Sequence, residues 1–246
     1  MKTIVVIPAR YKSTRFPGKP LKKLLGKPLI QWVAELSSKA VGKKNVYVAT
    51  ENNKILKTVK QLGFKAIMTS EKCLTGTDRL SEVARKIKAD IYINVQGDEP
   101  LVNPKDIKKI IIAKKKYYNE VINGYSIIEK KEDPNSINIP KVIFSGDRRL
   151  IYISRKSIPG NKEIKNKPSV YYKQVCIYAF NRKELLKYGK YGRKSILEKS
   201  EDIEILRFFE WSKIIRLVKT SPGTLAVDEP KDINKVELEL KKTLIK

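Results

Sequence analysis

Residues 3–20 read Thr3-Ile4-Val5-Val6-Ile7-Pro8-Ala9-Arg10-Tyr11-Lys12-Ser13-Thr14-Arg15-Phe16-Pro17-Gly18-Lys19-Pro20, an apolar strand that runs directly into a basic loop. In open α/β sheets, ligands bind at the carboxyl ends of parallel strands, which is where this loop begins. Arg10, Arg15 and Lys19 supply cations with no carboxylate between them. The stretch therefore predicts a binding site for a polyphosphate.

The loop is also stiff. Its three prolines each fix φ and remove an amide donor, so the path of the backbone is specified. Gly18 directly precedes Lys19, where the backbone can approach a phosphate while the ammonium group reaches over it. The glycine spacing matches neither the P-loop nor the dinucleotide-binding GxGxxG motif. The alternative is that the segment is only an exposed, lysine-rich connection.

Composition narrows the chemistry. The chain has 246 residues, no histidine and two cysteines, Cys73 and Cys176, which lie in unrelated contexts. These facts argue against histidine acid–base catalysis, serine or cysteine triads and the common zinc sites. No apolar run approaches the roughly 18 to 20 residues of a membrane span, and the first strand is too short for a signal peptide. We expect a cytoplasmic protein with no membrane insertion.

The balance of 53 Lys and Arg against 26 Asp and Glu gives a net charge of +27, which raises the possibility of nucleic-acid binding. The lysines are scattered along the chain, with only short clusters such as Lys114-Lys115-Lys116. No recognisable nucleic-acid module or basic tail is present. We therefore expect no specific nucleic-acid partner, although a nucleic-acid-binding module stays open as a rival class.

Strand and helix periods alternate along the first half of the chain. This pattern predicts an α/β protein with a doubly wound, mostly parallel sheet. We treat residues 1–246 as one domain, in which about 125–185 form an inserted β-hairpin and strand layer that faces a substrate or a second subunit. Expected strands cover 2–8, 45–50, 65–68, 91–95, 142–144, 150–153, 175–180 and 214–218, and expected helices cover 29–40, 54–62, 78–87, 203–211 and 233–244.

Two further segments place an acidic turn directly after a run of apolar residues. Asn94-Val95-Gln96-Gly97-Asp98-Glu99-Pro100 follows a buried strand, and Leu225-Ala226-Val227-Asp228-Glu229-Pro230 repeats the arrangement near the C-terminus. Magnesium takes one or two carboxylates together with waters and phosphate oxygens. Asp98 and Asp228 are therefore the expected Mg²⁺ ligands beside a triphosphate, the alternative being that each only caps a following helix.

A third segment, Thr75-Gly76-Thr77-Asp78-Arg79-Leu80, is typical of a helix start. Together with the first loop it could form a wall that reads a nucleotide base.

These motifs, in this order, resemble the 3-deoxy-manno-octulosonate cytidylyltransferases, also called CMP-KDO synthetases. The resemblance covers nearly the whole chain and also includes Ser154-Arg155 and Ile177-Tyr178. It implies a nucleotide-diphospho-sugar transferase-like fold, usually a homodimer. The implied enzyme condenses CTP with the acidic sugar KDO to give the CMP-sugar and pyrophosphate, for lipopolysaccharide or outer-envelope synthesis. The related sialate cytidylyltransferases begin similarly but differ in the loop.

The resemblance also implies roles for individual residues. Arg15 and Lys19 would hold the β- and γ-phosphates, and Asp98 and Asp228 would carry Mg²⁺. The expected nucleotide-binding residues are Ala9, Arg10, Ser13, Arg15, Lys19, Thr75, Arg79 and Gln96. The expected sugar-binding residues are Gln96, Arg155, Gln174, Tyr178 and Glu204.

Departures from the family pattern fall in the sugar pocket. Gln174 stands where the family has a histidine, and Glu204-Ile205 replaces a Glu-Gln pair. Sites built on hydrogen bonds are sensitive to such exchanges. The acceptor could therefore be KDO, its 8-amino-8-deoxy analogue or another nonulosonic acid.

Overall fold

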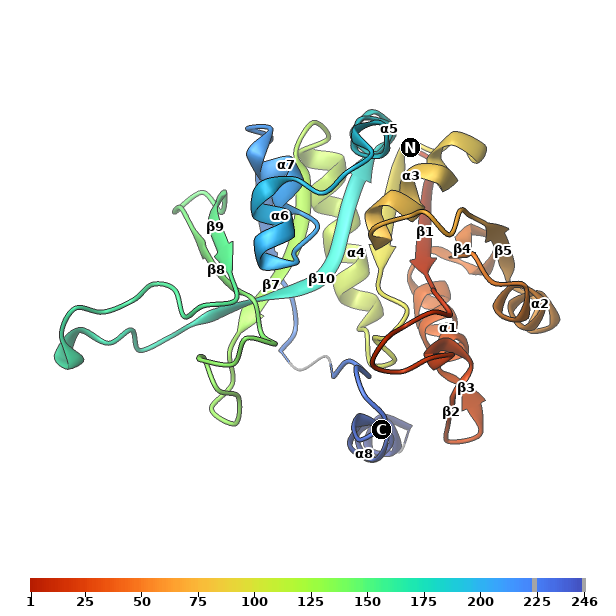
Figure 1. Cartoon of the computed structure of the whole chain (residues 1–246), viewed down its shortest axis with the longest axis horizontal. Helices are drawn as coiled ribbons and strands as arrows, with labels where there is room; N and C mark the ends of the chain where they lie inside the picture. The colour runs from red at the N-terminus through yellow and green to blue at the C-terminus, as the bar shows by residue number, and fades with distance from the viewer. Residues whose placement is uncertain (223–224, 245–246) are drawn as a thin grey trace.

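A computed structural model describes residues 1–222 and 225–244, and a twisted mixed sheet organises them (Figure 1). The main path of this sheet runs β11-β7-β10-β6-β1-β4-β5. Its strands are β1 (Thr3–Pro8), β4 (Val46–Thr50), β5 (Lys65–Met68), β6 (Ile91–Val95), β7 (Val121–Ile127), β10 (Tyr172–Asn181) and β11 (Ile215–Lys219).

The sheet is mostly parallel. β1 pairs in parallel with β4 and β6, and β11 pairs in parallel with β7. β10 is the exception, because it runs antiparallel to both of its neighbours, β6 and β7. The carboxyl ends of β1 and β6 consequently lie at the same edge, as the sequence predicted.

Helices cover both faces of the sheet, which confirms the doubly wound α/β fold. One face packs against α1, α2 and α4, and the other against α3, α5 and α7. The helices are α1 (Leu29–Val41), α2 (Asn53–Gln61), α3 (Gly76–Lys86), α4 (Pro104–Lys116), α5 (Arg182–Tyr191), α6 (Ile196–Glu201), α7 (Leu206–Glu210) and α8 (Asp232–Leu244), with short 3₁₀ turns at Lys19–Leu21, Lys43–Asn45 and Ile164–Asn166.

Local sequence explains two helix starts that were not expected from periodicity. Asn103 caps α4 by accepting a hydrogen bond from the Lys105 amide, and a proline occupies the first turn. Asn181 and Glu184 form a reciprocal capping box at the start of α5. The helix expected over 203–211 is shorter: only α7 is helical, and the turn before it carries Glu204.

The predicted hairpin is confirmed, with β8 (Lys141–Phe144) antiparallel to β9 (Leu150–Ser154). A long arm, residues 155–171, then projects from the molecule before β10 begins (Figure 1). The expected inserted layer needs one correction. β10 does not belong to an added layer but lies within the main sheet, between β6 and β7.

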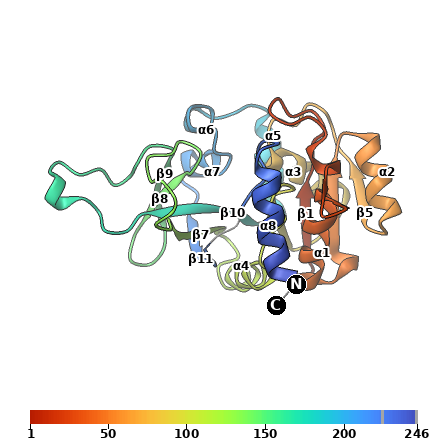
Figure 2. The same cartoon turned by 90° about the horizontal axis from the view of Figure 1, so that it is seen from below.

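The C-terminal segment returns to the start of the chain. α8 lies beside α1 and the small hairpin formed by β2 (Lys23–Leu24) and β3 (Lys27–Pro28) (Figures 1 and 2). A separate apolar cluster holds it there, in which Val227, Val236 and Leu240 pack with Phe16 and Trp32. This cluster brings the segment that contains Asp228 next to the first loop.

Candidate active site

Four predicted catalytic side chains converge beyond the carboxyl edge of the sheet. The Lys19 Nζ lies 2.7 Å from the Asp98 Oδ2, and an Arg15 guanidinium nitrogen lies 3.1 Å from the Asp228 Oδ1. Lys19 is largely buried, with 13% of its side chain exposed, whereas Arg15 is 57% exposed. Residues separated by more than 200 positions in sequence therefore form one compact group of two cations and two carboxylates.

Backbone contacts fix this arrangement. The Lys19 ammonium also donates to the Val227 carbonyl at 2.7 Å, and the Val227 amide donates to the Asp98 carbonyl at 2.9 Å. The two acidic turns are thereby joined directly, and Lys19 bridges them. Gly97 permits the close approach of β1 and β6, since a Cβ at this position would lie 2.6 Å from the Pro8 carbonyl oxygen.

The first loop holds its shape through its own hydrogen bonds. Gly18 adopts φ 68°, and its amide donates to the Tyr11 carbonyl at 2.9 Å. The Ser13 hydroxyl accepts from the Phe16 amide at 3.4 Å, so this side chain supports a turn. Arg10 is exposed, whereas Ala9 is buried and its amide donates to the Ala49 carbonyl, so its side chain belongs to the core.

Arg79 is deeply buried, contrary to the expectation of a residue that lines the nucleotide site. It forms an ion pair of 3.0 Å with Glu51 and donates to the Thr69 hydroxyl at 2.7 Å. Glu51 in turn accepts from the Tyr11 amide at 2.7 Å. The pair therefore ties α3 to the first loop. Glu51 was not among the residues predicted from the sequence. It directly follows β4, so the rule that ligands bind at the carboxyl ends of parallel strands could have identified it.

Thr75 caps α3, as predicted from the helix-start pattern of this segment. Its hydroxyl and the Asp78 carboxylate form a reciprocal capping box. The adjacent Gly76 lies against the end of β1, where a Cβ would stand 3.2 Å from Pro8 and 3.4 Å from a Glu204 carboxylate oxygen. This turn thus forms a wall between the first loop and Glu204.

The Glu204 carboxylate accepts hydrogen bonds from several neighbouring donors. One carboxylate oxygen accepts from the Gln96 amide group at 3.1 Å and from Asn94 at 3.4 Å, and the other accepts from the Thr77 backbone amide at 2.9 Å. Burial raises the pKa of the Glu204 carboxyl above its ordinary value, although the Thr77 hydrogen bond opposes the shift. Gln96 and Glu204 therefore form a single polar unit, and their role toward a sugar stays a prediction.

The other predicted sugar-binding residues are more enclosed. Tyr178 is buried in the core, where desolvation raises the pKa of its phenol far above the usual value. Gln174 is buried and donates to the Asn123 side chain at 3.1 Å. Arg155 directs its guanidinium at the carbonyls of residues 137, 201 and 202. In this conformation Arg155 braces two loops, and its role toward a sugar carboxylate stays a prediction.

Asp98 and Asp228 are the candidate ligands for a divalent cation at this site. Among the described residues, no group of three or more Asp, Glu or Cys side chains could hold a metal by itself. The pair Asp98 and Asp228 is instead the kind of set that Mg²⁺ uses when phosphate oxygens and water complete its shell. The residues therefore fit a cation that arrives with a nucleotide.

A doubly wound sheet with a cationic first loop and two carboxylates at its edge is typical of the nucleotidyltransferases. Similarity to known proteins identifies the family within this class. A family model described as cytidylyltransferase matches residues 4–215, and the chain belongs to this family.

The described residues include no helix long and apolar enough to cross a membrane.

Individual relatives match nearly the full length. The chain is 36% identical to proteins named 8-amino-3,8-dideoxy-manno-octulosonate cytidylyltransferase from Shewanella frigidimarina and Shewanella oneidensis, covering 98% of this chain and 99% of each relative. A solved CMP:2-keto-3-deoxy-manno-octonic acid synthetase in complex with CTP is 35% identical, with a TM-score of 0.91 over 99% of this chain and all of the other. A cytidylyltransferase from Leptospira borgpetersenii, 17% identical with a TM-score of 0.63 over 96% of this chain and 85% of the other, shares the fold.

Proposed function

We propose that the protein transfers CMP from CTP to a 3-deoxy-octulosonic acid and releases pyrophosphate. The observation that carries this proposal is the convergence of Arg15, Lys19, Asp98 and Asp228 at the edge of the sheet. The names of the relatives, and the CTP in the similar solved structure, support both the nucleotide and the class of acceptor.

The chemistry asks the protein chiefly to position groups and neutralise charge. The anomeric hydroxyl of the sugar attacks the α-phosphorus and gives up its proton to solvent. The bond between the α-phosphorus and the oxygen that bridges to the β-phosphorus breaks, and pyrophosphate leaves with that electron pair. Lys19 and Arg15 would exchange their present carboxylate partners for phosphate oxygens and stabilise the charge on the leaving group. Gln96 and Glu204 would orient the acceptor from the opposite side.

Asp98 and Asp228 would hold Mg²⁺ in the loaded enzyme. When bound, the ion would lower the charge of the triphosphate and help to polarise the phosphorus. The structural support is the hydrogen-bonded union of the two acidic turns that carry these aspartates.

For the acceptor, we propose the 8-amino-8-deoxy analogue of KDO, with KDO itself as the second candidate. The names of the Shewanella relatives favour the amino sugar. A further support is that the Gln174 amide group donates to the Asn123 side chain and that Ile205 is buried and apolar, so the hydrogen bonding at these two positions differs from that of the histidine and glutamine in the family pattern. KDO stays a candidate because the solved CMP:2-keto-3-deoxy-manno-octonic acid synthetase is 35% identical to this chain, nearly the 36% of the Shewanella relatives.

We also propose that the protein is a cytoplasmic homodimer that contributes to lipopolysaccharide synthesis. The support for a subunit contact is an apolar groove at the base of the arm, lined by Phe144, Pro159, Val170 and Tyr172 among others, together with Ile164 on the arm, 89% exposed. Light scattering on the unchanged protein and on Ile164→Glu tests this point, because a monomer in both would contradict it.

A pyrophosphate-release assay with four nucleoside triphosphates and three sugars, namely KDO, its 8-amino analogue and a sialic acid, tests the activity. Among the four nucleoside triphosphates, we expect turnover only with CTP. We expect the kcat/KM for the amino sugar to be at least about ten-fold above that for KDO. A large preference for KDO would remove the amino-sugar proposal. Release with sialic acid only, or with none of the sugars, would contradict the octulosonic acid class.

A further inference from the structure

A buried polar cluster lies behind the substrate-facing residues, formed by Asp78, Tyr188, Glu198 and Arg207. The Arg207 guanidinium is fully buried and holds both Glu198 carboxylate oxygens at 2.7 Å in a bidentate pair. It also donates to the Asp78 carboxylate at 3.1 Å and to the Tyr188 carbonyl at 3.2 Å. Its Cζ stands 3.6 Å from the centre of the Tyr188 ring, a cation–π contact.

The hydroxyl of Tyr188 is the point where this cluster meets the proposed active site. It lies 3.0 Å from a Glu198 oxygen, 3.3 Å from the Thr75 hydroxyl and 3.2 Å from the Glu204 backbone carbonyl. Burial and the neighbouring Glu204 raise the pKa of this phenol well above its usual value, so the hydroxyl keeps its proton.

The two ends that Tyr188 joins lie on different sides of the site. Thr75 begins the turn that packs on Pro8 at the end of β1, which is the nucleotide side. Glu204 receives the Gln96 side chain, which is the proposed acceptor side. One hydroxyl therefore contacts both the wall of the nucleotide site and the segment that would orient the sugar.

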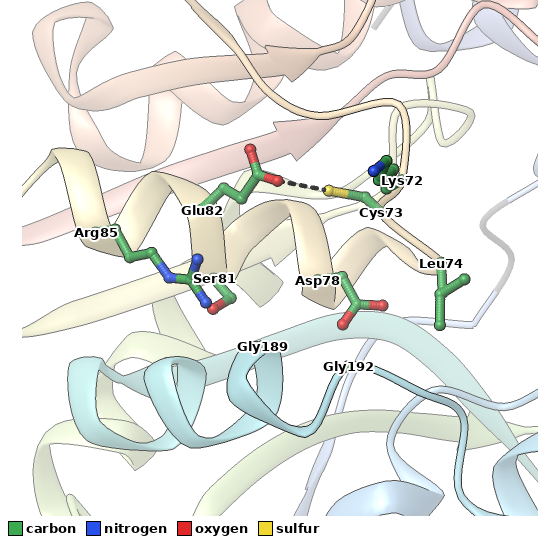
Figure 3. Close-up of a pocket in the computed structure, with 9 residues that line it drawn as sticks. All are labelled: Lys72, Cys73, Leu74, Asp78, Ser81, Glu82, Arg85, Gly189 and Gly192. Atoms are coloured by element: carbon green, nitrogen blue, oxygen red, sulfur yellow. Dashed lines mark hydrogen bonds between the residues drawn. The ribbon is translucent and has the colours of Figure 1, made fainter.

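The helices that carry this linkage are closely packed. α3 and α5 lie side by side, with Ser81 facing Gly189 across the contact and Asp78 at its edge (Figure 3). A Cβ on Gly189 would lie 2.1 Å from the Ser81 hydroxyl oxygen, so there is no room for a larger residue. Tyr188 is thus held on a helix that cannot move closer to α3 at this contact without a clash.

We propose that Tyr188 is a positioning residue. Its hydroxyl fixes Thr75, on the wall of the nucleotide site, relative to Glu204, which would orient the sugar. This inference rests on the proposed transferase function, and it assigns the cluster a role in the alignment of two substrates. In-line attack is sensitive to displacements of about 1 Å, because the reacting atoms must approach to about 3 to 3.5 Å. Replacing a buried ion-pair cluster by an apolar core of the same volume is often neutral for stability, so a gain in stability does not by itself account for such a cluster. In this proposal the cluster contributes the geometry that it enforces.

Tyr188→Phe tests the proposal because it removes one hydroxyl and keeps the ring beneath Arg207. Thr75 and Glu198 retain their bonds to Asp78 and Arg207, so the fold is preserved. The matched control is Tyr191→Phe, a change on the same helix at a half-exposed ring that packs on Trp211. Turnover is measured per CTP-binding site, counted by calorimetric titration with CTP, so that unfolded molecules do not contribute.

We expect Tyr188→Phe to lower kcat at least about ten-fold, with the Kd of CTP and the KM of the sugar each within about three-fold of the unchanged protein. Tyr191→Phe should keep kcat within about two-fold. Arg207→Lys loses the planar pair of N–H donors that holds both Glu198 oxygens while the same group reaches Asp78. We expect this variant, like Tyr188→Phe, to lower kcat while the Kd of CTP and the KM of the sugar stay within about three-fold.

A kcat for Tyr188→Phe within two-fold of the unchanged protein, or an equal loss in Tyr191→Phe, would overturn the positioning role. A loss confined to CTP affinity would also overturn it. If the unchanged protein bound CTP but turned over none of the sugars, the proposed function would fail first, and the two failures are thereby distinguished.

Discussion

Asp98→Asn separates catalysis from folding at the proposed site. The substitution keeps the shape of the side chain and one oxygen for Lys19, whose Nζ lies 2.7 Å away, but removes the negative charge. The Asp98 backbone carbonyl, which accepts from the Val227 amide, is unaffected. Only the charge available to Lys19 and to a metal-bound nucleotide changes.

The expected loss of stability is small. Two unit charges about 4 Å apart attract by about 4 kcal/mol at an effective dielectric constant of about 20. Asp98 and Lys19 are 29% and 13% exposed, and the cost of their desolvation offsets most of that attraction. We expect the free energy of unfolding to fall by about 1 kcal/mol, equivalent to about 2–4 °C in Tm for a domain of this size.

The expected loss of activity is much larger, because a charge aimed at the reacting phosphate is lost from a partly buried site. We expect kcat to fall by about 10²- to 10³-fold, or about 3–4 kcal/mol of transition-state stabilisation. Pyrophosphate release and thermal melting are measured on the same preparation. Asp147→Asn, in the exposed hairpin turn, is the charge-matched control and should keep full activity. Near-normal turnover in Asp98→Asn would refute the role of this carboxylate.

Three other predictions concern the scaffold. Burial lowers the pKa of Lys114, which pairs with Glu184, to about 8, so between pH 8 and 10.5 the unfolded chain binds more protons at this group. The stability of the unchanged protein relative to Lys114→Met should therefore rise with pH across this window in urea titrations, and a flat or falling difference would contradict it. Gly189→Ala should lower the free energy of unfolding by about 1–3 kcal/mol through overpacking on Ser81, and the added change Ser81→Gly should restore most of it; failure of this rescue would place the clash elsewhere. Burial and the Glu82 carboxylate raise the pKa of the Cys73 thiol to about 12, so at pH 8 only about one molecule in 10⁴ is a thiolate. Iodoacetamide should label Cys73 at least about a hundred-fold faster after denaturation, and mass spectrometry showing equal rates would count against the buried environment.

The sequence was sufficient to predict the convergence of Lys19 with Asp98, because one physical rule connects them. The carboxyl ends of neighbouring parallel strands meet at one edge of a sheet, and both segments begin at such ends. Asp228 follows no described strand. Its prediction rested on the repeated apolar-to-Asp-Glu-Pro pattern, and its place beside Arg15 comes from the packing of α8 against the first loop.

Other features depend on pairing that periodicity does not encode. The apolar run at residues 175–180 identifies a strand, but it does not say that this strand, β10, enters the main sheet antiparallel between β6 and β7. The burial of Arg79 is similarly set by a partner, Glu51, that lies on another strand end. Tyr188 gave no signal, since a tyrosine in an amphipathic helix is ordinarily a core residue, and only the three-dimensional contacts of its hydroxyl distinguish it.

Binding of Mn²⁺ with CTP, followed by electron paramagnetic resonance, tests the central claim most directly. Mn²⁺ accepts the same oxygen ligands as Mg²⁺ and is visible in this experiment. If Asp98 and Asp228 hold a cation on the triphosphate, the unchanged protein should bind Mn²⁺ and CTP together, and the double variant Asp98→Asn/Asp228→Asn should weaken that binding at least about a hundred-fold. A double variant that binds Mn²⁺ and CTP as tightly as the unchanged protein would contradict the account.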